Sequence, residues 1–323
     1  MNKFDALLVF SFGGPEKRED VLPFLENVLR GRGVPHERML EVAEHYYHFD
    51  GRSPINDQNK ELIAALEQEF STHGENMPIY WGNRNWDPML PDTLKQMQAD
   101  GVRHAAAFVT SAFGSYSGCR QYREDIAREQ QQTGTENIVI EKLPNFWDRA
   151  EFIEVMTERV RSAMAELPGA EQLIFTAHSI PTSMADASPY VRQLKEAGAR
   201  VAAACGMSNW TLVYQSRSGP PSQPWLEPDI CEYLRAQHAA GLQRVILCPI
   251  GFMSDHMEVL YDLDTEARDL CDEIGLKMVR AGTAGSHPKL ISMIRDMVFN
   301  AQTSAVMAHC EPGCCPTPQR PKS

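Results

Sequence analysis

The sequence lacks the features that mark several common classes of protein. It has no cationic leader followed by a long apolar segment, because the apolar run near Phe4 to Phe10 is short and carries an acid near its start. We therefore expect neither secretion nor a membrane span, and we expect a cytoplasmic location. Heptads, tandem repeats and low-complexity runs are also missing, which argues against coiled coils and repeat architectures.

Positive charge is scarce as well. Lys and Arg number 31 against 43 Asp and Glu, for a formal net charge of −12, whereas a nucleic-acid partner would require a basic face. The turn Gly13-Gly14-Pro15 lacks the later glycines and the Gly-Lys-Ser/Thr signature of a phosphate loop, which disfavours a nucleotide site. The remaining composition, 43% apolar over 323 residues, is typical of a globular protein large enough for two domains.

Short apolar stretches alternate with amphipathic segments along the chain. This alternation predicts parallel βαβ units, and the same unit recurs in both halves. The predicted strands cover 6–11, 78–82, 104–110, 172–177, 210–215, 244–250 and 276–281, and the predicted helices cover 23–29, 61–70, 91–98, 151–165, 190–204, a segment after Pro228, and the acidic segment described below.

A histidine stands at the end of one predicted strand. The apolar run 172–177 leads directly into His178-Ser179-Ile180-Pro181. Because proline cannot continue a strand and restricts the residue before it, we expect His178 at the strand end. A single histidine of this kind is more often a hydrogen-bonded structural residue than a ligand.

A second predicted strand leads into a cluster of ionisable residues. Since ligands bind at the carboxyl ends of parallel strands, this position favours chemistry. Three acids spaced every fourth residue predict a ladder along one helix face, each step rotated by roughly 40°. Acids also favour the first turns of any helix, but that preference does not explain the adjacent histidine. The cluster contains Asp255, His256, Glu258, Asp262, Asp264 and Glu266, and the ladder is Glu258, Asp262 and Glu266.

The segments TAHSIP (176–181) and SDHME (254–258) resemble ferrochelatases, the enzymes that insert iron into a porphyrin. Such agreement is far more specific when it is collinear over most of a chain than when it is one short motif. The sequence of these segments most resembles the actinobacterial branch of the family, which makes haem by way of coproporphyrin. The agreement extends through LLVFSFGGPE (7–16), FLENVLRGRGVP (24–35), GRSPINDQN (51–59), YWGNRNWDP (80–88), SAFGSYSGCRQYRED (111–125) and QSRSGPPSQPWLEPD (215–229).

The resemblance implies an α/β fold of two doubly wound, Rossmann-like or flavodoxin-like domains with the porphyrin in the cleft between them. We expect an N-terminal domain over 1–148, a C-terminal domain with the histidine and the acidic helix over 149–308, and a cysteine-rich tail over 309–323. We expect a monomer whose partners are the porphyrin and neighbouring enzymes of haem synthesis.

The resemblance also implies an activity of the lyase class, the insertion of Fe²⁺ into coproporphyrin III to give coproheme. Protoporphyrin IX is the alternative substrate. Neutral imidazole suits both proton acceptance and ferrous ligation near pH 7, so His178 is the expected base or metal donor. In the family, a glutamate at the position of Glu258 faces the histidine. The resemblance implies that Asp262 and Glu266 continue a path for hydrated iron or released protons. Asp255 and His256 are expected to hold the orientation of Glu258.

Residues from several segments are expected to contact the porphyrin. Arginine forks suit its carboxylates, and glycine allows the backbone to approach a flat ring. Phe12 would lie over the ring, where relatives carry tyrosine or methionine. Each of these residues taken alone is also compatible with an ordinary surface or core role. The expected contacts are Phe12, Arg30, Arg32, Arg52, Ser53 and Tyr122, with Trp225 and Phe252 as apolar walls.

Three cysteines gather near the C-terminus. Cys310, Cys314 and Cys315 resemble the motif of ferrochelatases that carry a [2Fe-2S] cluster, for which thiolates are the usual ligands. The fourth ligand is not identified, because the loop 184–190, which supplies it in some relatives, has no cysteine. A zinc site and a disordered thiol-bearing tail are the alternatives. The other five cysteines are expected to be reduced thiols.

Two other classes of function remain open at this point. A non-catalytic porphyrin or haem carrier would keep an aromatic cleft but would not need both His178 and Glu258. A cobalt or nickel chelatase would be expected to bring more histidines to the metal and to lack the segment FLENVLRGRG (24–33).

Overall fold

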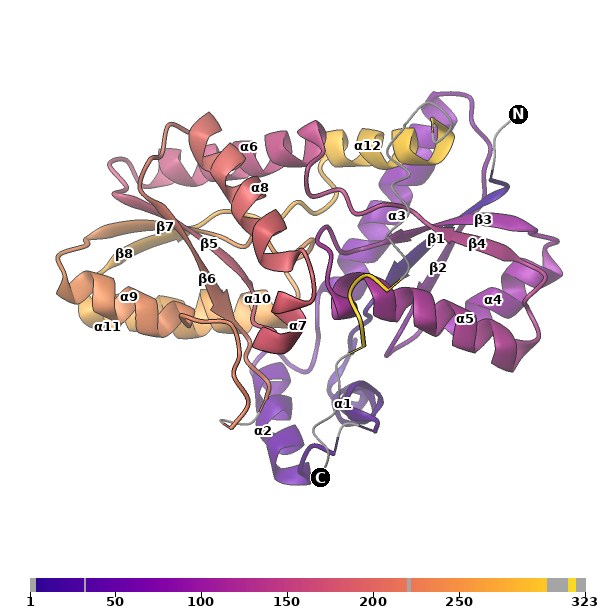
Figure 1. Cartoon of the computed structure of the whole chain (residues 1–323), viewed down its shortest axis with the longest axis horizontal. Coiled ribbons are helices and arrows are strands. Elements are labelled where there is room, and N and C mark those ends of the chain that lie inside the picture. The colour runs from indigo at the N-terminus through magenta and orange to yellow at the C-terminus, as the bar shows by residue number, and fades with distance from the viewer. Residues whose placement is uncertain (1–3, 32, 220–221, 301–312, 318–323) are drawn as a thin grey trace. The chain divides into compact units, whose positions relative to one another are not determined.

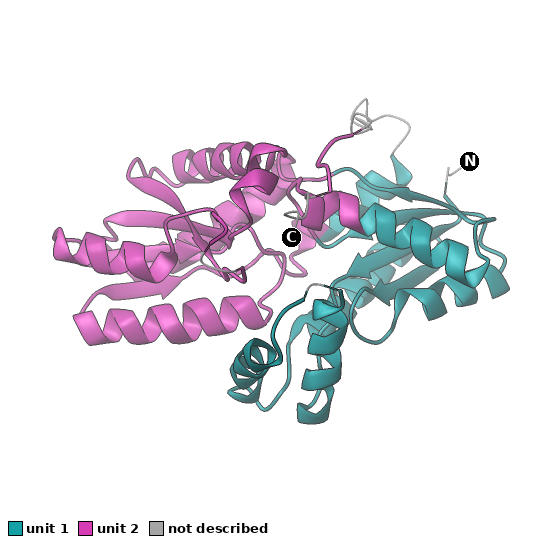
Figure 2. Cartoon of the chain, turned by 60° about the horizontal axis from the view of Figure 1, so that its bottom comes forward, with its two compact units in different colours: residues 1–110, 122–144, 291–308 teal, residues 111–121, 145–290, 309–323 magenta. Residues whose placement is uncertain are grey.

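The computed structural model describes residues 4–31, 33–219, 222–300 and 313–317. The chain forms two compact units, shown in Figures 1 and 2. Unit 1 contains residues 1–110, 122–144 and 291–308, and unit 2 contains residues 111–121, 145–290 and 309–323. The predicted domain limits at 148/149 and 308/309 stay predictions. None of the helices in the described ranges is both long enough and apolar enough to cross a membrane.

Unit 1 is built on a four-stranded parallel sheet of order β2-β1-β3-β4. Its strands are β1 (Ala6–Ser11), β2 (Ile79–Asn83), β3 (His104–Val109) and β4 (Val139–Lys142). Its helices are the 3₁₀ turn η1 (Arg18–Asp20), α1 (Val21–Leu29), α2 (His36–Tyr47), α3 (Ile55–Thr72), α4 (Leu90–Ala99), α5 (Gln121–Thr133) and most of α12 (Pro288–Phe299).

The sheet of unit 1 is covered on both faces, which is why its central strands β1 and β3 read as nearly continuous apolar runs. Helices α4 and α5 pack on one face, where Leu94 and Ile126 join a buried cluster with Leu8 and Phe10. Helices α3 and α12 lie on the other side in Figure 1. A separate small cluster joins α1 to α2.

Unit 2 repeats the same topology. Its four parallel strands have the order β6-β5-β7-β8, so within each unit the strands read 2-1-3-4. This is the flavodoxin type of winding, in which the first and third strands flank the topological switch point. The strands are β5 (Gln172–His178), β6 (Trp210–Gln215), β7 (Arg244–Cys248) and β8 (Lys277–Arg280). The predicted α/β class, with one doubly wound unit used twice, is therefore confirmed.

Helices cover both faces of the second sheet. Figure 1 shows α6 (Ala150–Glu166) and α8 (Tyr190–Ala204) on one side, and α9 (Ile230–Ala239) and α11 (Ala267–Ile274) on the other. Ile174 and Leu247 of the sheet pack with Leu263 and Leu270 in the core on the α9 side. The remaining helical elements of unit 2 are the π turn η2 (Tyr116–Arg120), α7 (Thr182–Asp186), α10 (Met257–Tyr261) and the π turn η3 (Asp262–Glu266).

Several elements were not predicted. Helix α3 begins at Ile55, ahead of the predicted start at 61, and β4, α2, α5 and α12 were missed. Helix α5 buries little beyond Tyr122, Asp125 and Ile126, so its apolar periodicity is weak. Strand β4 is a short edge strand with Val139 exposed, and such a strand has no buried run to reveal it.

The acidic helix also differs from the prediction, because it is not α-helical throughout. Between α10 and α11 the chain forms the π turn η3, in which the Ala267 amide bonds to the Asp262 carbonyl. A π turn holds one residue more than an α turn. The step from Asp262 to Glu266 therefore lacks the constant rotation expected of an α-helical ladder, while Glu258 to Asp262 keeps it.

A glycine allows the loop after β7 to lie against β5. Gly251 donates its amide to the Thr176 carbonyl at 3.0 Å. A Cβ at Gly251 would lie 2.6 Å from the Ala177 Cβ and 2.7 Å from its Cα, closer than real Cβ contacts allow. Only glycine permits this approach, which keeps the ends of β5 and β7 together.

We expect Gly251→Ala to lower the free energy of unfolding by about 1–3 kcal/mol, because the added methyl meets backbone that cannot move aside as a side chain could. Denaturant unfolding measures this. Gly282→Ala is the matched control, since the nearest atoms to its Cβ would belong to the Arg159 side chain, at 3.4 Å or more. Equal stability of the two variants would contradict the close-approach argument.

Candidate active site

The switch point of the second sheet brings a histidine and a glutamate together. Strand β5 ends at His178, and β7 leads through a loop to Glu258 in the first turn of α10. His178 Nε2 lies 3.3 Å from Glu258 Oε1, and the two side chains are 30% and 43% exposed. The residues predicted from two separate strand ends are thus in contact and accessible.

Hydrogen bonds fix the orientation of His178. Its Nδ1 lies within hydrogen-bonding distance of the Ser179 carbonyl, which can only accept, so Nδ1 carries a proton. Its own carbonyl accepts from the Tyr190 hydroxyl at 3.1 Å. The ring is therefore held with Nε2 directed at Glu258.

The two charges decide the protonation states of the pair. Burial lowers the pKa of His178, but the Glu258 carboxylate and the bond to Ser179 outweigh it and raise this pKa to about 9. Burial raises the pKa of Glu258, and the His178 charge overcomes that effect and lowers it to about 2. Both shifts favour an imidazolium paired with a carboxylate near pH 7 before substrates bind, whereas the sequence predicted a neutral imidazole. The role of His178 as base or metal donor stays a prediction.

His256 supports Glu258 through the backbone. Its Nδ1 accepts a hydrogen bond from the Glu258 amide at 3.2 Å and caps α10, while its Nε2 lies 4.0 Å from Glu258 Oε2. Burial lowers the pKa of His256, which agrees with a neutral ring acting as acceptor. The Phe252 ring packs edge-on against it at 5.1 Å between centroids.

Asp262 is held by the loop after β6. Ser216 Oγ donates to its Oδ2, and Gln215 Nε2 donates to the same oxygen at 3.3 Å and to the Glu258 carbonyl at 2.8 Å. Burial raises the pKa of Asp262; Ser216 opposes this and Glu258 adds to it, giving about 7. Burial also raises the pKa of Glu266, and Asp229 adds to the effect. Sequence reasoning missed Gln215 and Ser216, although Gln215 ends a predicted strand and Ser216 directly follows it.

The acids and histidines do not form a closed metal cage. Among the described residues, no three His, Cys, Asp or Glu side chains converge so as to hold a metal ion. The metal-binding roles of His178, Glu258, Asp262 and Glu266 therefore stay predictions, and the geometry shows a contacting pair followed by separately held carboxyls.

In unit 1, Arg84, which the sequence analysis did not single out, lies near two residues expected to contact the porphyrin. The Arg84 guanidinium lies 4.8 Å from the Tyr122 ring centroid and 5.9 Å from that of Phe12. Arg84 Nε also pairs with Asp125 Oδ2 at 2.6 Å, and both side chains are less than a tenth exposed. Tyr122 is buried, and Phe12 is half-buried against Phe24. Arg84 lies within YWGNRNWDP (80–88), a segment that resembles the family, and this position could have pointed to it.

The other expected porphyrin residues differ in accessibility. Arg30 is exposed and bonds Asn27 at 2.5 Å, and Arg52 is exposed and pairs with Asp57. Ser53 is buried. Arg32 lies outside the described residues. In unit 2, Trp225 is half-buried and Phe252 belongs to the apolar core.

The tail does not complete a cluster site within the described residues. Cys314 is half-buried, Cys315 is buried, and the Cys314 carbonyl accepts from Arg120 Nη1 at 3.4 Å. Cys310 lies outside the described residues, and the described ranges bring no set of three ligands together. The described part of the tail thus supplies Cys314 and Cys315 but not a complete set of cluster ligands. The cluster stays a prediction from resemblance, and no step proposed below involves it.

The two parallel sheets of order 2-1-3-4 resemble the fold of solved chelatases. The sirohydrochlorin chelatase SirB from Bacillus subtilis subspecies spizizenii shares this fold, with a TM-score of 0.56 and 11% identity over 93% of this chain and 97% of that chain. CbiX, the terminal enzyme for sirohaem biosynthesis in denitrifying bacteria, gives a TM-score of 0.53 and 14% identity over 92% and 99%.

The ferrochelatase family model matches residues 4–302, and the chain belongs to the ferrochelatase family. It is 54% identical over 299 residues to the ferrochelatase of Rhodopirellula baltica, covering 91% of this chain and 85% of the relative. It is 47% identical over 350 residues to the coproporphyrin III ferrochelatase of Streptomyces coelicolor, covering 97% and 93%. The predicted family and enzyme class are confirmed, and Fe²⁺ is the substrate metal.

Replacing Glu258 by glutamine tests the electrostatic coupling of the pair. Because burial alone lowers the pKa of His178, its value should fall from about 9 toward or below that of an exposed histidine, roughly 6.5. Titration of the imidazole by NMR measures this. Glu273→Gln, at an exposed position of α11, should leave the titration unchanged. An unaltered titration in Glu258→Gln would show that the pair is not coupled.

Proposed function

We propose that this ferrochelatase inserts Fe²⁺ into coproporphyrin III to give coproheme, with His178 and Glu258 at the reaction centre. The single observation that carries the proposal is the 3.3 Å contact between His178 Nε2 and Glu258 Oε1 at the switch point of the second sheet. Chelation needs a base for the pyrrole protons and oxygen or nitrogen donors for the ion, and this pair offers both at one accessible position.

The stoichiometry sets what the pair must do. Ferrous ion replaces two pyrrole N–H protons, so each turnover releases two protons while the four ring nitrogens gain the metal. His178 holds a proton at pH 7 because its pKa is about 9. An approaching divalent cation repels that charge and lowers the pKa of His178. The Nε2 proton passes to the Glu258 carboxylate and on to Asp262 or solvent, which frees the Nε2 lone pair to take one pyrrole proton. The second pyrrole proton leaves by the same route, and Glu258 returns to its ionised form.

Asp262 is suited to pass protons away from the pair. With a pKa of about 7, its carboxyl can accept and release a proton near neutral pH. Gln215 links it to the Glu258 backbone, so the two acids stay at a fixed spacing. Glu266, whose pKa is also raised, continues the series at the end of the π turn. Carboxylate oxygens on the same path suit a hydrated ferrous ion.

We expect His178→Ala and Glu258→Gln each to lower kcat by about 10²- to 10⁴-fold, because each removes a proton acceptor that works in the transition state. Absorbance of the metalated porphyrin at saturating Fe²⁺ measures turnover, and fluorescence quenching measures porphyrin binding, which should persist. His238→Ala is the control, since that ring bonds only the Leu242 carbonyl at the end of α9 among the described contacts. Near-wild-type turnover in either variant would remove that residue from the mechanism.

The preference for coproporphyrin rests on its four propionates and on cationic residues of unit 1. Arg30 and Arg52 are exposed, and arginine forks bind carboxylates through both oxygens. Arg52 already pairs with Asp57, so a propionate there would compete with an internal carboxylate. Exposed pairs of this kind contribute about 0.2–1 kcal/mol each, and salt screens them. Relatives named coproporphyrin III ferrochelatase support the same choice.

We expect kcat/KM to favour coproporphyrin III over protoporphyrin IX by tenfold or more, which corresponds to about 1.4 kcal/mol, and the ratio to fall as ionic strength rises. Arg52→Gln should reduce the ratio and Asp57→Asn should increase it, because the latter frees the guanidinium. Arg192→Gln removes an exposed arginine of α8 that pairs with Glu196, and it should change nothing. Equal values for the two porphyrins would overturn the substrate proposal and leave the family assignment intact.

A further inference from the structure

Arg280, the last residue of β8, binds two carboxylates at once. Its Nε and Nη2 donate to the two oxygens of Asp264 at 2.6 and 2.7 Å, and its Nη1 donates to Asp255 Oδ1 at 2.8 Å. The Arg280 side chain is 14% exposed. A two-pronged bond of this geometry fixes direction as well as distance, which a lysine cannot do.

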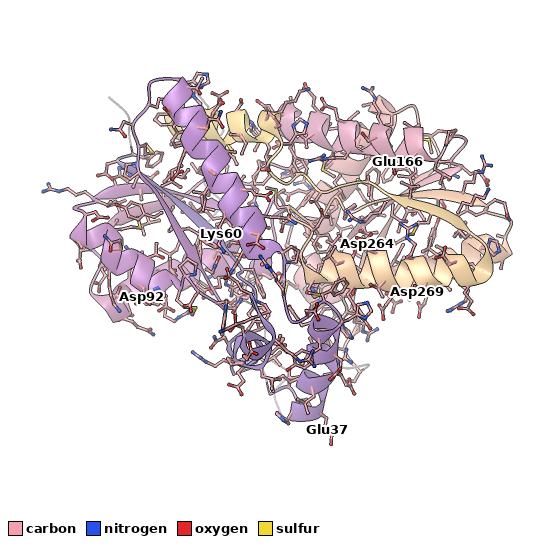
Figure 3. The ribbon with its side chains drawn as sticks, turned by 180° about the vertical axis from the view of Figure 1, so that it is seen from behind. Glu37, Lys60, Asp92, Glu166, Asp264 and Asp269 are labelled. Atoms are coloured by element: carbon pink, nitrogen blue, oxygen red, sulfur yellow. The ribbon has the colours of Figure 1, made fainter. Side chains whose placement is uncertain are left out.

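The two aspartates lie at opposite ends of the segment that carries the candidate catalytic acid. Asp255 directly precedes His256, the residue that caps α10. Asp264 lies inside the π turn η3, on the helix shown in Figure 3, where it is labelled. Glu258 and Asp262 lie between them. Arg280 therefore fastens both ends of this segment to one edge strand of the sheet.

Glu258 needs such support because little else holds its side chain. It is 43% exposed, and its carboxylate contacts His178 at 3.3 Å and His256 at 4.0 Å. Its direction is therefore set by its backbone, whose amide bonds His256 and whose carbonyl bonds Gln215. Helix α10 continues without a break into η3 and α11, so a contact made at Asp264 acts on the same helix that carries Glu258.

We propose that Arg280 is a positioning residue for metal insertion, which keeps Glu258 directed at His178 by holding Asp255 and Asp264. The inference rests on the proposed roles of His178 and Glu258. Arg280 touches neither of them in the described contacts and acts through the backbone of the segment it fastens. Residues that orient a metal-handling group in this way typically change metal affinity or activity by about 10- to 100-fold when replaced.

The test compares Arg280→Gln with a matched arginine. Arg268 of α11 donates to the Met278 carbonyl on the same strand at 2.8 Å and contacts no carboxylate in the described residues. Arg280→Gln should lower kcat/KM for Fe²⁺ by about 10- to 100-fold and leave porphyrin affinity within about twofold. Arg268→Gln should change neither. Arg280→Lys keeps the charge but not the fork, so it should recover only part of the loss.

A second readout separates positioning from general destabilisation. If Arg280→Gln lets Glu258 turn away, the pKa of His178 should fall in the same direction as we expect for Glu258→Gln, and NMR titration detects this without turnover. Should Arg280→Gln fail to fold, Asp264→Asn removes the paired carboxylate, keeps Arg280, and should give the same kinetic and NMR changes.

Three results would overturn the proposal. They are unchanged kcat/KM for Fe²⁺, an equal loss in Arg268→Gln, and a loss confined to porphyrin affinity with the His178 titration unaltered. Assaying the wild-type enzyme with both porphyrins beside the variants separates the test of Arg280 from the test of the substrate proposal. Wild type that metalates only protoporphyrin would refute the coproporphyrin proposal, and the Arg280 comparison would then be read with that porphyrin.

Discussion

The ion pair between His178 and Glu258 is the interaction around which the strand ends of unit 2 are arranged. It requires β5 and β7 to be neighbours, which the 2-1-3-4 winding provides, and it requires the loop after β7 to lie against β5, which Gly251 permits. Around it, Ser179, His256 and Gln215 satisfy the nearby backbone and ring atoms. Each charge stabilises the other, so neither residue has the protonation behaviour it would show alone.

The sequence supported the class of fold and the two central residues. Continuous apolar runs marked the buried strands, and His178 and Glu258 were found because each follows such a run. Their contact could be expected because carboxyl ends of parallel strands meet at one edge. The pKa of His178 could not, since it depends on the balance between burial and a 3.3 Å charge contact that spacing does not reveal.

Residues whose role depends on contacts between elements distant in the sequence could not be predicted from the sequence. Gln215, Ser216 and Arg280 each stand at or just after the end of a strand, but what they bind follows from strand order. Arg84 was hidden for a similar reason, because its partner Asp125 lies on α5, a helix too polar to predict. Among the missed elements, α2, α5 and β4 bury few side chains, so periodicity gives little signal. Helix α12 is different, because it buries Leu290, Ile291, Met293, Ile294 and Val298.

The π turn η3 bears on how this helix can change in length during evolution. A π turn accommodates one additional residue as a local bulge. A single-residue deletion between Asp262 and Glu266 could therefore be absorbed by return to regular α-helix, with Leu270 and Cys271 of α11 still facing the core. The acids would meanwhile change their positions relative to one another. Insertions and deletions at this one place thus offer a lineage a way to rearrange the acidic side chains without repacking the protein.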